Sequence, residues 1–219
     1  MFKRTHPYPP FIPEGSTKLI VGTLPPPRFV TQDFKLGDVD FCYGSIDGLL
    51  WKVLDEAFSL QLSYETTVKA IEQRKNFLQK YKIGICDIVS SAKRKKIDAS
   101  DLGMYDAELR PIVSILRENP SIETLLLMGG NSKNGPEYFL RKHLKTHQIS
   151  LILENEAHPK EHFFKLSDHR NIRVVSLISP SGAANMAIGS MQEYKELKNK
   201  NPKFNTFDFR VKQYATYFS

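Results

Sequence analysis

The chain has 219 residues, of which 41% are hydrophobic and 25% charged, and these values fit one globular domain over residues 1–219. Its apolar runs are too short to cross a bilayer and its proline-rich start does not fit a secretory signal, so we expect a cytoplasmic protein with no membrane partner. The net charge of +7 suits a polyanionic partner such as DNA or RNA.

Buried strands and amphipathic helices are expected to alternate along the chain. Residues 1–16, rich in proline and aromatic side chains, predict an irregular N-terminal arm, and residues 28–48 a long irregular stretch. Short apolar runs predict strands at residues 18–23, 83–88, 124–128, 149–153 and 173–177. Helical spacing of apolar residues predicts helices at residues 49–58, 64–80, 109–116, 136–147, 190–197 and 207–218, with a capping box at Ser190 and Glu193. The pattern predicts a three-layer α/β/α sandwich with a short, mostly parallel central sheet.

The loops after the predicted strands are the expected location of a binding site. In open sheets of this class, ligands bind beside the carboxyl ends of the strands. These loops begin after Thr23, Asp87, Met128 and Ile178. The glycine-rich segment 129–133 follows one strand but lacks the spacing of a phosphate-binding loop, so we interpret it as a strand-to-helix turn.

Three of these segments resemble the motifs of one enzyme family. They are Gly-Thr-Leu-Pro-Pro at 22–26, Phe-Cys-Tyr-Gly-Ser-Ile-Asp-Gly-Leu-Leu-Trp at 41–51 and Ser-Pro-Ser-Gly-Ala-Ala-Asn at 179–185. In this order they resemble the uracil-DNA glycosylase superfamily, closest to its mismatch-specific and hypoxanthine-type branches. Segment 84–89 with Arg94 and Asp98 is similar to a further motif of the hypoxanthine-type branch. The resemblance covers roughly residues 15–200.

The resemblance implies a pocket that holds a base flipped out of nucleic acid. Tyr43 would stack on the base, unless it is only a core aromatic of a long loop. The turn after the first strand would present rigid backbone groups to the base edge, or would only reverse the chain. The implied base-binding residues are Gly22, Thr23, Leu24, Pro25, Tyr43 and Asp87.

The resemblance also implies a DNA-binding loop. Its serine hydroxyls and backbone N–H groups would contact phosphates, although serines in such a loop can equally cap local backbone. The residues of this loop are Ser179, Pro180, Ser181, Gly182, Ala183 and Asn185, and the basic run at Lys93 and Arg94 is a further candidate. Because Ala183, Ala184 and Asn185 are small, the wedge that replaces a flipped base looks weak, which suits single strands or damaged duplexes.

The two places where the family carries its catalytic residue do not hold a suitable side chain. Leu24 stands in the first motif and Gly48 in the second, and neither can position water. Asp47 is the best substitute, because a carboxylate can align water and favour a cationic sugar. Ser45 could bind water or base, and Asp87 and Asp98 are weaker candidates. Each acid could instead stabilise a loop or cap a helix.

No metal or cofactor is expected. His158, His162 and His169 lack a completing set of ligands and are interpreted as surface histidines in a polar loop. Cys42 and Cys86 are interpreted as buried, reduced thiols.

The expected function is that of a monomeric DNA glycosylase. It would hydrolyse the N-glycosidic bond of a damaged, deaminated or modified base in single-stranded DNA or a damaged duplex. Two alternatives remain open from the sequence: a catalytically silent nucleic-acid-binding relative, motivated by Leu24 and Gly48, and a nucleoside or nucleotide binder that uses the same pocket.

Overall fold

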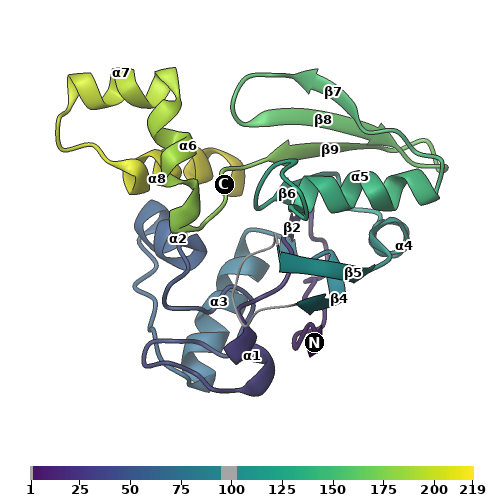
Figure 1. The fold of residues 1–219 in the computed structure, drawn as a ribbon, viewed down its shortest axis with the longest axis horizontal. Coiled ribbons are helices and arrows are strands. Elements are labelled where there is room, and N and C mark those ends of the chain that lie inside the picture. The colour runs from purple at the N-terminus through teal and green to yellow at the C-terminus, as the bar shows by residue number, and fades with distance from the viewer. Residues whose placement is uncertain (1, 95–102) are drawn as a thin grey trace.

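A six-stranded sheet forms the centre of the fold (Figure 1). The computed structural model describes residues 2–94 and 103–219, so Lys95, Lys96 and Asp98 lie outside the described residues. The strand order is β3-β2-β6-β9-β8-β7. The first four of these strands run parallel: β3 (Ile83–Ile85), β2 (Lys18–Val21), β6 (Thr124–Leu127) and β9 (Asn171–Ser176). The last two pair antiparallel, β8 (Lys160–Lys165) and β7 (Ile152–Asn155).

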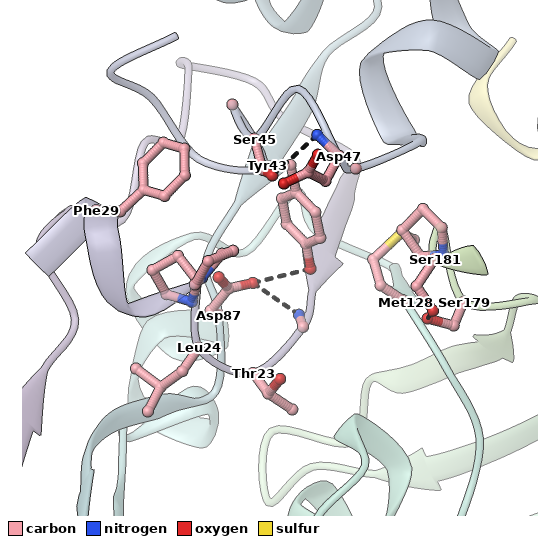
Figure 2. A pocket seen from close by; sticks show the side chains of 16 residues that line it. Thr23, Leu24, Phe29, Tyr43, Ser45, Asp47, Asp87, Met128, Ser179 and Ser181 are labelled. Carbon is pink, nitrogen blue, oxygen red and sulfur yellow. Dashed lines mark hydrogen bonds between the residues drawn. The ribbon is translucent and has the colours of Figure 1, made fainter. Parts of the chain in front are cut away.

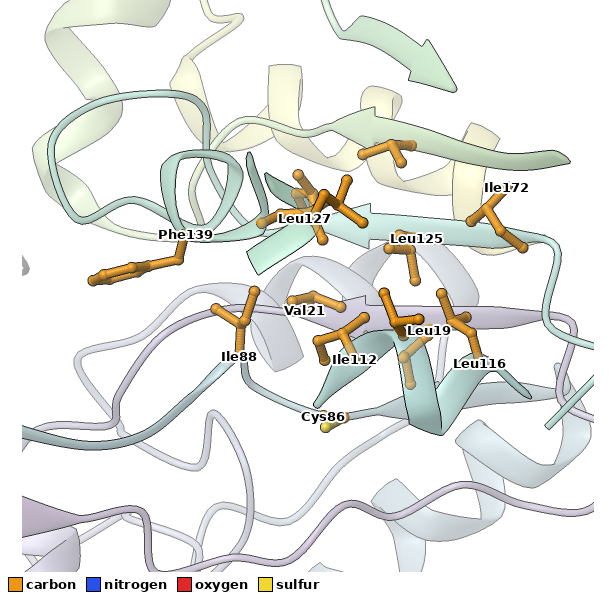
Figure 3. Packing of buried hydrophobic residues seen from close by; sticks show 14 of the residues in the cluster. Leu19, Val21, Cys86, Ile88, Ile112, Leu116, Leu125, Leu127, Phe139 and Ile172 are labelled. Carbon is orange, nitrogen blue, oxygen red and sulfur yellow. The ribbon is translucent and has the colours of Figure 1, made fainter. Parts of the chain in front are cut away.

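Successive side chains of a strand point to opposite faces of the sheet. In the parallel strands both faces are buried, because helices cover each of them. In β2, Leu19 and Val21 pack with α4 (Ile112–Glu118) and α5 (Pro136–Thr146) on one face (Figure 3). Ile20 packs on the other face with α2 (Leu50–Phe58), α3 (Val68–Lys80) and α8 (Thr206–Phe218). The α/β/α prediction is confirmed, and β3, β2, β6 and β9 match predicted strands.

A second, three-stranded antiparallel sheet was not predicted. It has the order β1-β4-β5 and consists of β1 (Phe2–Thr5), β4 (Val89–Arg94) and β5 (Met104–Leu109). Ala92 and Met104 pack it against the core on the side of α4 and α5. The prediction of an irregular arm over residues 1–16 is therefore wrong for β1, whose four residues pair with Ser91–Arg94 far along the chain. Local patterns carry no information about such distant pairing.

Several element boundaries also differ from the predictions. α3 begins at Val68 rather than at 64, because the Thr67 side chain accepts a hydrogen bond from the N–H of Ala70 and caps the helix. The predicted capping box at Ser190 is wrong, since Met191 is the N-cap of α7 (Gln192–Lys200). A capping box forms instead at Asn205 and Asp208, at the start of α8. β8 was not predicted.

Three short helices complete the described fold. They are α1 (Pro27–Thr31), the 3-10 helix η2 (Gly182–Ala184) and α6 (Asn185–Ser190). α1 begins at a proline, which is tolerated in the first turn of a helix. Within the parts of the chain that the structure describes, no helix combines the length and the apolar character needed to cross a membrane.

Candidate functional site

The parallel strands end at one pocket of about 240 Å³, here called the strand-end pocket (Figure 2). All four predicted loops contribute to it, because parallel strands place their carboxyl ends at the same edge of the sheet. Its lining consists of Gly22, Thr23, Leu24, Pro25, Pro26, Phe29, Tyr43, Gly44, Ser45, Asp47, Gly48, Asp87, Met128, Ser179, Pro180 and Ser181. The structure thus brings the implied base-binding residues together with Asp47, Ser45 and the first three residues of the DNA-binding loop.

Asp87 is the buried anchor of this pocket. Its Oδ1 accepts a hydrogen bond of 2.9 Å from the Gly22 N–H and one of 3.0 Å from the Tyr43 hydroxyl (Figure 2). Its Oδ2 lies 2.8 Å from Nε2 of His6, whose side chain is also buried. One carboxylate therefore links the turn after β2, the aromatic wall and the N-terminal segment.

Tyr43 is held in an uncommon conformation. Its φ of 57° lies in the left-handed region, which residues with a side chain rarely adopt. Burial, and next the nearby Asp87 carboxylate, raise the pKa of the Tyr43 hydroxyl well above its usual value, so the phenol stays protonated and donates to Asp87. The ring is thereby fixed as one wall of the pocket (Figure 2).

Gly22 leaves the space that the Tyr43 hydroxyl occupies. A Cβ atom at position 22 would lie 1.7 Å from Tyr43 Oη and 2.8 Å from Asp87 Oδ1. We expect Gly22→Ala to displace the tyrosine ring and to lower the free energy of unfolding by about 1–3 kcal/mol, as overpacking does. Urea denaturation measures this loss, and Gly182→Ala is the matched control, because its Cβ would meet no atom within 4 Å. Equal stability of the two variants would contradict the contact.

His6 is a site-supporting residue that the sequence did not indicate. The backbone N–H of His6 donates to the Ser90 carbonyl, which continues the pairing of β1 with β4 and delivers the imidazole to Asp87. Its Nδ1 lies 3.0 Å from the Tyr8 carbonyl oxygen and 3.1 Å from the Tyr8 nitrogen. No local signal marks His6, because its role depends on pairing across more than 80 residues.

Asp47 lies at the rim of the pocket and is paired with two cations. Its side chain is 60% exposed, and its Oδ2 accepts hydrogen bonds from Lys35 at 2.9 Å and from Arg28 at 3.1 Å. The hydrogen bond from Lys35 lowers the pKa of Asp47 below its usual value, so the carboxylate is ionised at neutral pH. Among the described residues, no group donates to its Oδ1.

Ser45 and Asp38 hold the arginine that pairs with Asp47. The buried Asp38 carboxylate accepts from Arg28 Nε at 2.6 Å and from Nη2 at 2.9 Å. Nη2 also donates to the Ser45 hydroxyl at 2.8 Å. Arg28 was not among the predicted site residues, because it lies in a stretch that was expected to be irregular.

Arg210 holds the loop at 179–185 in place. Its guanidinium is fully buried and donates to the carbonyl oxygens of Ser179 and Ser181 and to Oδ1 of Asn185. Burial lowers the pKa of Arg210 from its usual value. In the same loop, the Pro180 carbonyl oxygen accepts a hydrogen bond from the Leu49 N–H. The segments 41–51 and 179–185 are therefore in direct contact.

The remaining predicted DNA contacts lie outside the strand-end pocket. Gly182, Ala183 and Asn185 are exposed beyond it, and Met186, which was not predicted, is 88% exposed beside them. The assignment of Arg94 to phosphate contacts is corrected, because this residue is only 1% exposed. Lys93 is partly exposed, but its Nζ forms an ion pair with Asp106 Oδ2 at 3.0 Å, between β4 and β5.

The deep walls of the strand-end pocket are largely apolar. Phe29 on α1 and Met128 after β6 are both buried and were not assigned to base binding. Leu24 also contacts the core, which gives this position a packing role.

No group of metal-ligating side chains occurs in the described part of the chain. The prediction of a surface histidine at position 162 is wrong, because strand β8 places this side chain inside with 2% exposure. Both cysteines are buried, and burial raises the pKa of each thiol.

Comparison with known proteins bears on the fold. No family model and no curated protein matches the chain. The structure is similar to the solution NMR structure of a "putative Uracil DNA glycosylase" from Methanosarcina acetivorans, with a TM-score of 0.53. The match covers 95% of this chain and 99% of the other. The two chains share one fold. Their sequence identity is 17%, so the similarity supports the fold, and the function has to be argued from the pocket.

Proposed function

We propose that the chain is a DNA glycosylase that binds a flipped, damaged or modified base in the strand-end pocket and hydrolyses its N-glycosidic bond. The observation that carries the proposal is a ring-sized pocket with an aromatic wall where four strand ends meet. A dry cavity of about 150 Å³ holds benzene. The strand-end pocket, with about 240 Å³, therefore has room for one heteroaromatic ring.

Tyr43 and the turn at residues 22–25 would hold the base. Because Asp87 fixes the phenol, the Tyr43 ring needs no further ordering before a base stacks on it. Three consecutive prolines, residues 25–27, close this turn, and Pro25 and Pro26 line the pocket, where they restrict the backbone. Such fixed groups can read a base edge at low entropic cost.

Asp47 would act on the water that attacks the sugar. Its Oδ2 is held by two cations, whereas its Oδ1 can accept a hydrogen bond from water. In the proposed step, water adds to C1′, the N-glycosidic bond breaks and its electron pair leaves with the base. Asp47 accepts the proton of the water, and backbone N–H groups of the pocket stabilise the departing base.

Asp87 is less suited to this step. Both of its oxygens already accept hydrogen bonds from Gly22, Tyr43 and His6 within the fold. A carboxylate committed to three internal donors has little capacity left for water. We therefore assign Asp87 to the architecture of the base-binding pocket and keep Asp47 as the proposed catalytic residue.

A base-release assay tests the proposed function. Oligonucleotides that carry uracil, hypoxanthine, mismatched thymine or an oxidised pyrimidine are incubated with the protein and then treated with alkali. We expect strand cleavage at one modified base, and a rate about 100- to 10,000-fold lower for Asp47→Ala, the range that removal of a general base produces. Asp33→Ala is the matched control, because Asp33 is an exposed acid near Asp47 in sequence that does not line the pocket.

A catalytically silent nucleic-acid binder is the second candidate, and the same assay decides between the two. Leu24 and Gly48 both line the pocket, where neither provides a side chain that could position water. Salt-sensitive DNA binding without cleavage of any substrate would favour the silent binder. Binding of free nucleosides, without binding of DNA, would overturn both candidates in favour of a small-molecule site.

A further inference from the structure

The guanidinium of Arg28 donates hydrogen bonds to Asp38, Ser45 and Asp47. Ser45 and Asp47 line the strand-end pocket, whereas Arg28 itself does not. The two lining residues lie side by side at one end of the pocket, where the Ser45 hydroxyl oxygen accepts from the Asp47 N–H at 3.2 Å (Figure 2). Arg28 therefore reaches the pocket through these two side chains.

The buried Asp38 carboxylate fixes the orientation of this guanidinium. It accepts from both Nε and Nη2 of Arg28, the two-point geometry that matches an arginine to a carboxylate. Its oxygens also accept from the backbone N–H groups of Lys35 and Ile46, at 2.9 and 2.8 Å. Because the carboxylate is itself tied to the backbone at two points, the remaining donors of Arg28 have a defined direction.

One proton of Arg28 serves two acceptors of the pocket. Nη2 carries two protons, and the two-point contact with Asp38 uses one of them. The Ser45 hydroxyl oxygen at 2.8 Å and Asp47 Oδ2 at 3.1 Å share the other. A shared proton requires its two acceptors to be neighbours, so Arg28 holds the Ser45 hydroxyl beside the Asp47 carboxylate.

Ser45 keeps a free donor beside a free acceptor of Asp47. A serine hydroxyl has one proton to donate and two lone pairs that accept. Both lone pairs of Ser45 are used, by Arg28 Nη2 and by the Asp47 N–H, and no acceptor for its proton occurs in the described part of the chain. Asp47 is complementary, because Arg28 and Lys35 hold its Oδ2 and leave its Oδ1 open.

We propose that Arg28 is a positioning residue that makes Ser45 and Asp47 the two sides of one water site. Ser45 donates to the attacking water, and Asp47 Oδ1 accepts from it. The second lone pair of this water forms the bond to C1′, its proton passes to Asp47, and the electron pair of the N-glycosidic bond leaves with the base. The inference rests on the proposed glycosylase function, and it supplies a water site that does not need a side chain at Leu24 or Gly48.

A double-mutant cycle tests whether Ser45 and Asp47 hold the same water. The substrate is the oligonucleotide with the fastest base release among those that carry uracil, hypoxanthine, mismatched thymine or an oxidised pyrimidine. Single-turnover kinetics give the maximal rate and the half-saturating protein concentration. We expect Ser45→Ala to lower the maximal rate about tenfold at unchanged half-saturation, as loss of one hydrogen bond does. In the Asp47→Ala background the same change should cost about twofold or less, because the water is no longer aligned.

Arg28→Lys tests the positioning role. Lysine keeps the charge beside Asp38 but lacks the planar fork, so it cannot hold all three partners together. We expect a maximal rate about tenfold lower, with about twofold or less further loss when Ser45→Ala is added. Arg170→Lys is the matched control, because Arg170 also binds an acid, Asp168, and backbone carbonyl oxygens, but does not line the pocket. It should leave the maximal rate within about twofold of the wild type.

The outcomes separate this inference from the proposed function. Equal losses for Ser45→Ala in both backgrounds, no loss in either, or an unchanged rate in Arg28→Lys would overturn the shared water site and leave the glycosylase proposal intact. A higher half-saturating concentration at an unchanged rate in Ser45→Ala would overturn it as well, because the hydroxyl would then bind the base. If Arg28→Lys does not fold, which thermal unfolding reports, the cycle of Ser45 and Asp47 still decides. Absence of base release from every oligonucleotide would overturn both proposals.

Discussion

Replacement of Arg210 by methionine is expected to lower the free energy of unfolding by roughly 3–5 kcal/mol, because each buried oxygen that loses its donor costs about 1–3 kcal/mol. Arg210 is fully buried and donates to Ser179, Ser181, Thr206 and Asn185. Methionine fills similar space but donates nothing, so buried carbonyl oxygens lose their partners. The loop that adjoins the strand-end pocket would lose its support, and DNA affinity should fall together with stability.

Urea denaturation and DNA titration of the same samples measure both effects of Arg210→Met. Lys212→Met is the matched control on α8, because Lys212 is exposed and pairs with Glu193 at the surface. We expect this control to stay within about 0.5 kcal/mol of the wild type. A stable Arg210→Met protein with unchanged DNA affinity would show that the loop does not depend on this arginine.

The second large effect is expected at Asp87. Asp87→Ala removes the acceptor for the Gly22 N–H, the Tyr43 hydroxyl and His6. Three buried donors would then lack a partner, and we expect a loss of roughly 3–5 kcal/mol with release of the Tyr43 ring. Thermal unfolding gives the stability, and the fluorescence of a 2-aminopurine placed at the flipped position reports stacking on Tyr43.

Asp87→Asn is the sharper control for this network. Its carbonyl oxygen can still accept from Gly22 and Tyr43, and its amide can donate to His6 Nε2. His6 can accept there if its ring proton moves to Nδ1, which can then donate to the Tyr8 carbonyl oxygen at 3.0 Å but no longer accepts from the Tyr8 N–H. We therefore expect Asp87→Asn to lose only about 1–2 kcal/mol and to keep the stacking signal. Equal damage from both substitutions would contradict the hydrogen-bond network.

The central sheet could be predicted from the sequence because its signals are local. Four-residue apolar runs such as residues 125–128 mark buried parallel strands. Because ligands bind at the carboxyl ends of parallel strands, the strand positions also predict the loops that meet at the strand-end pocket. Gly22 and Tyr43 were named for base binding from motif order alone. Their close contact, in which a Cβ at position 22 would lie only 1.7 Å from Tyr43 Oη, is visible only in three dimensions.

The residues that support the site could not be predicted in the same way. His6 reaches Asp87 through the pairing of β1 with β4, and Arg210 reaches Ser179 from a helix at the end of the chain. Both arginines of the site region, Arg28 and Arg210, look like ordinary surface residues in a basic sequence. The burial of Arg210 and the hydrogen bonds of Arg28 depend on tertiary contacts, for which composition and periodicity give no signal.

Amide chemical shifts give the most direct test of base binding in the strand-end pocket. The labelled protein is titrated with two single-stranded oligonucleotides that are identical except that one carries a base and the other an abasic sugar at the central position. We expect the base-bearing strand alone to shift the amides of Gly22, Tyr43 and Met128, while both strands shift those of Ser181 and Gly182. The same shifts at Gly22, Tyr43 and Met128 with the abasic strand, or none with either, would contradict a base in this pocket.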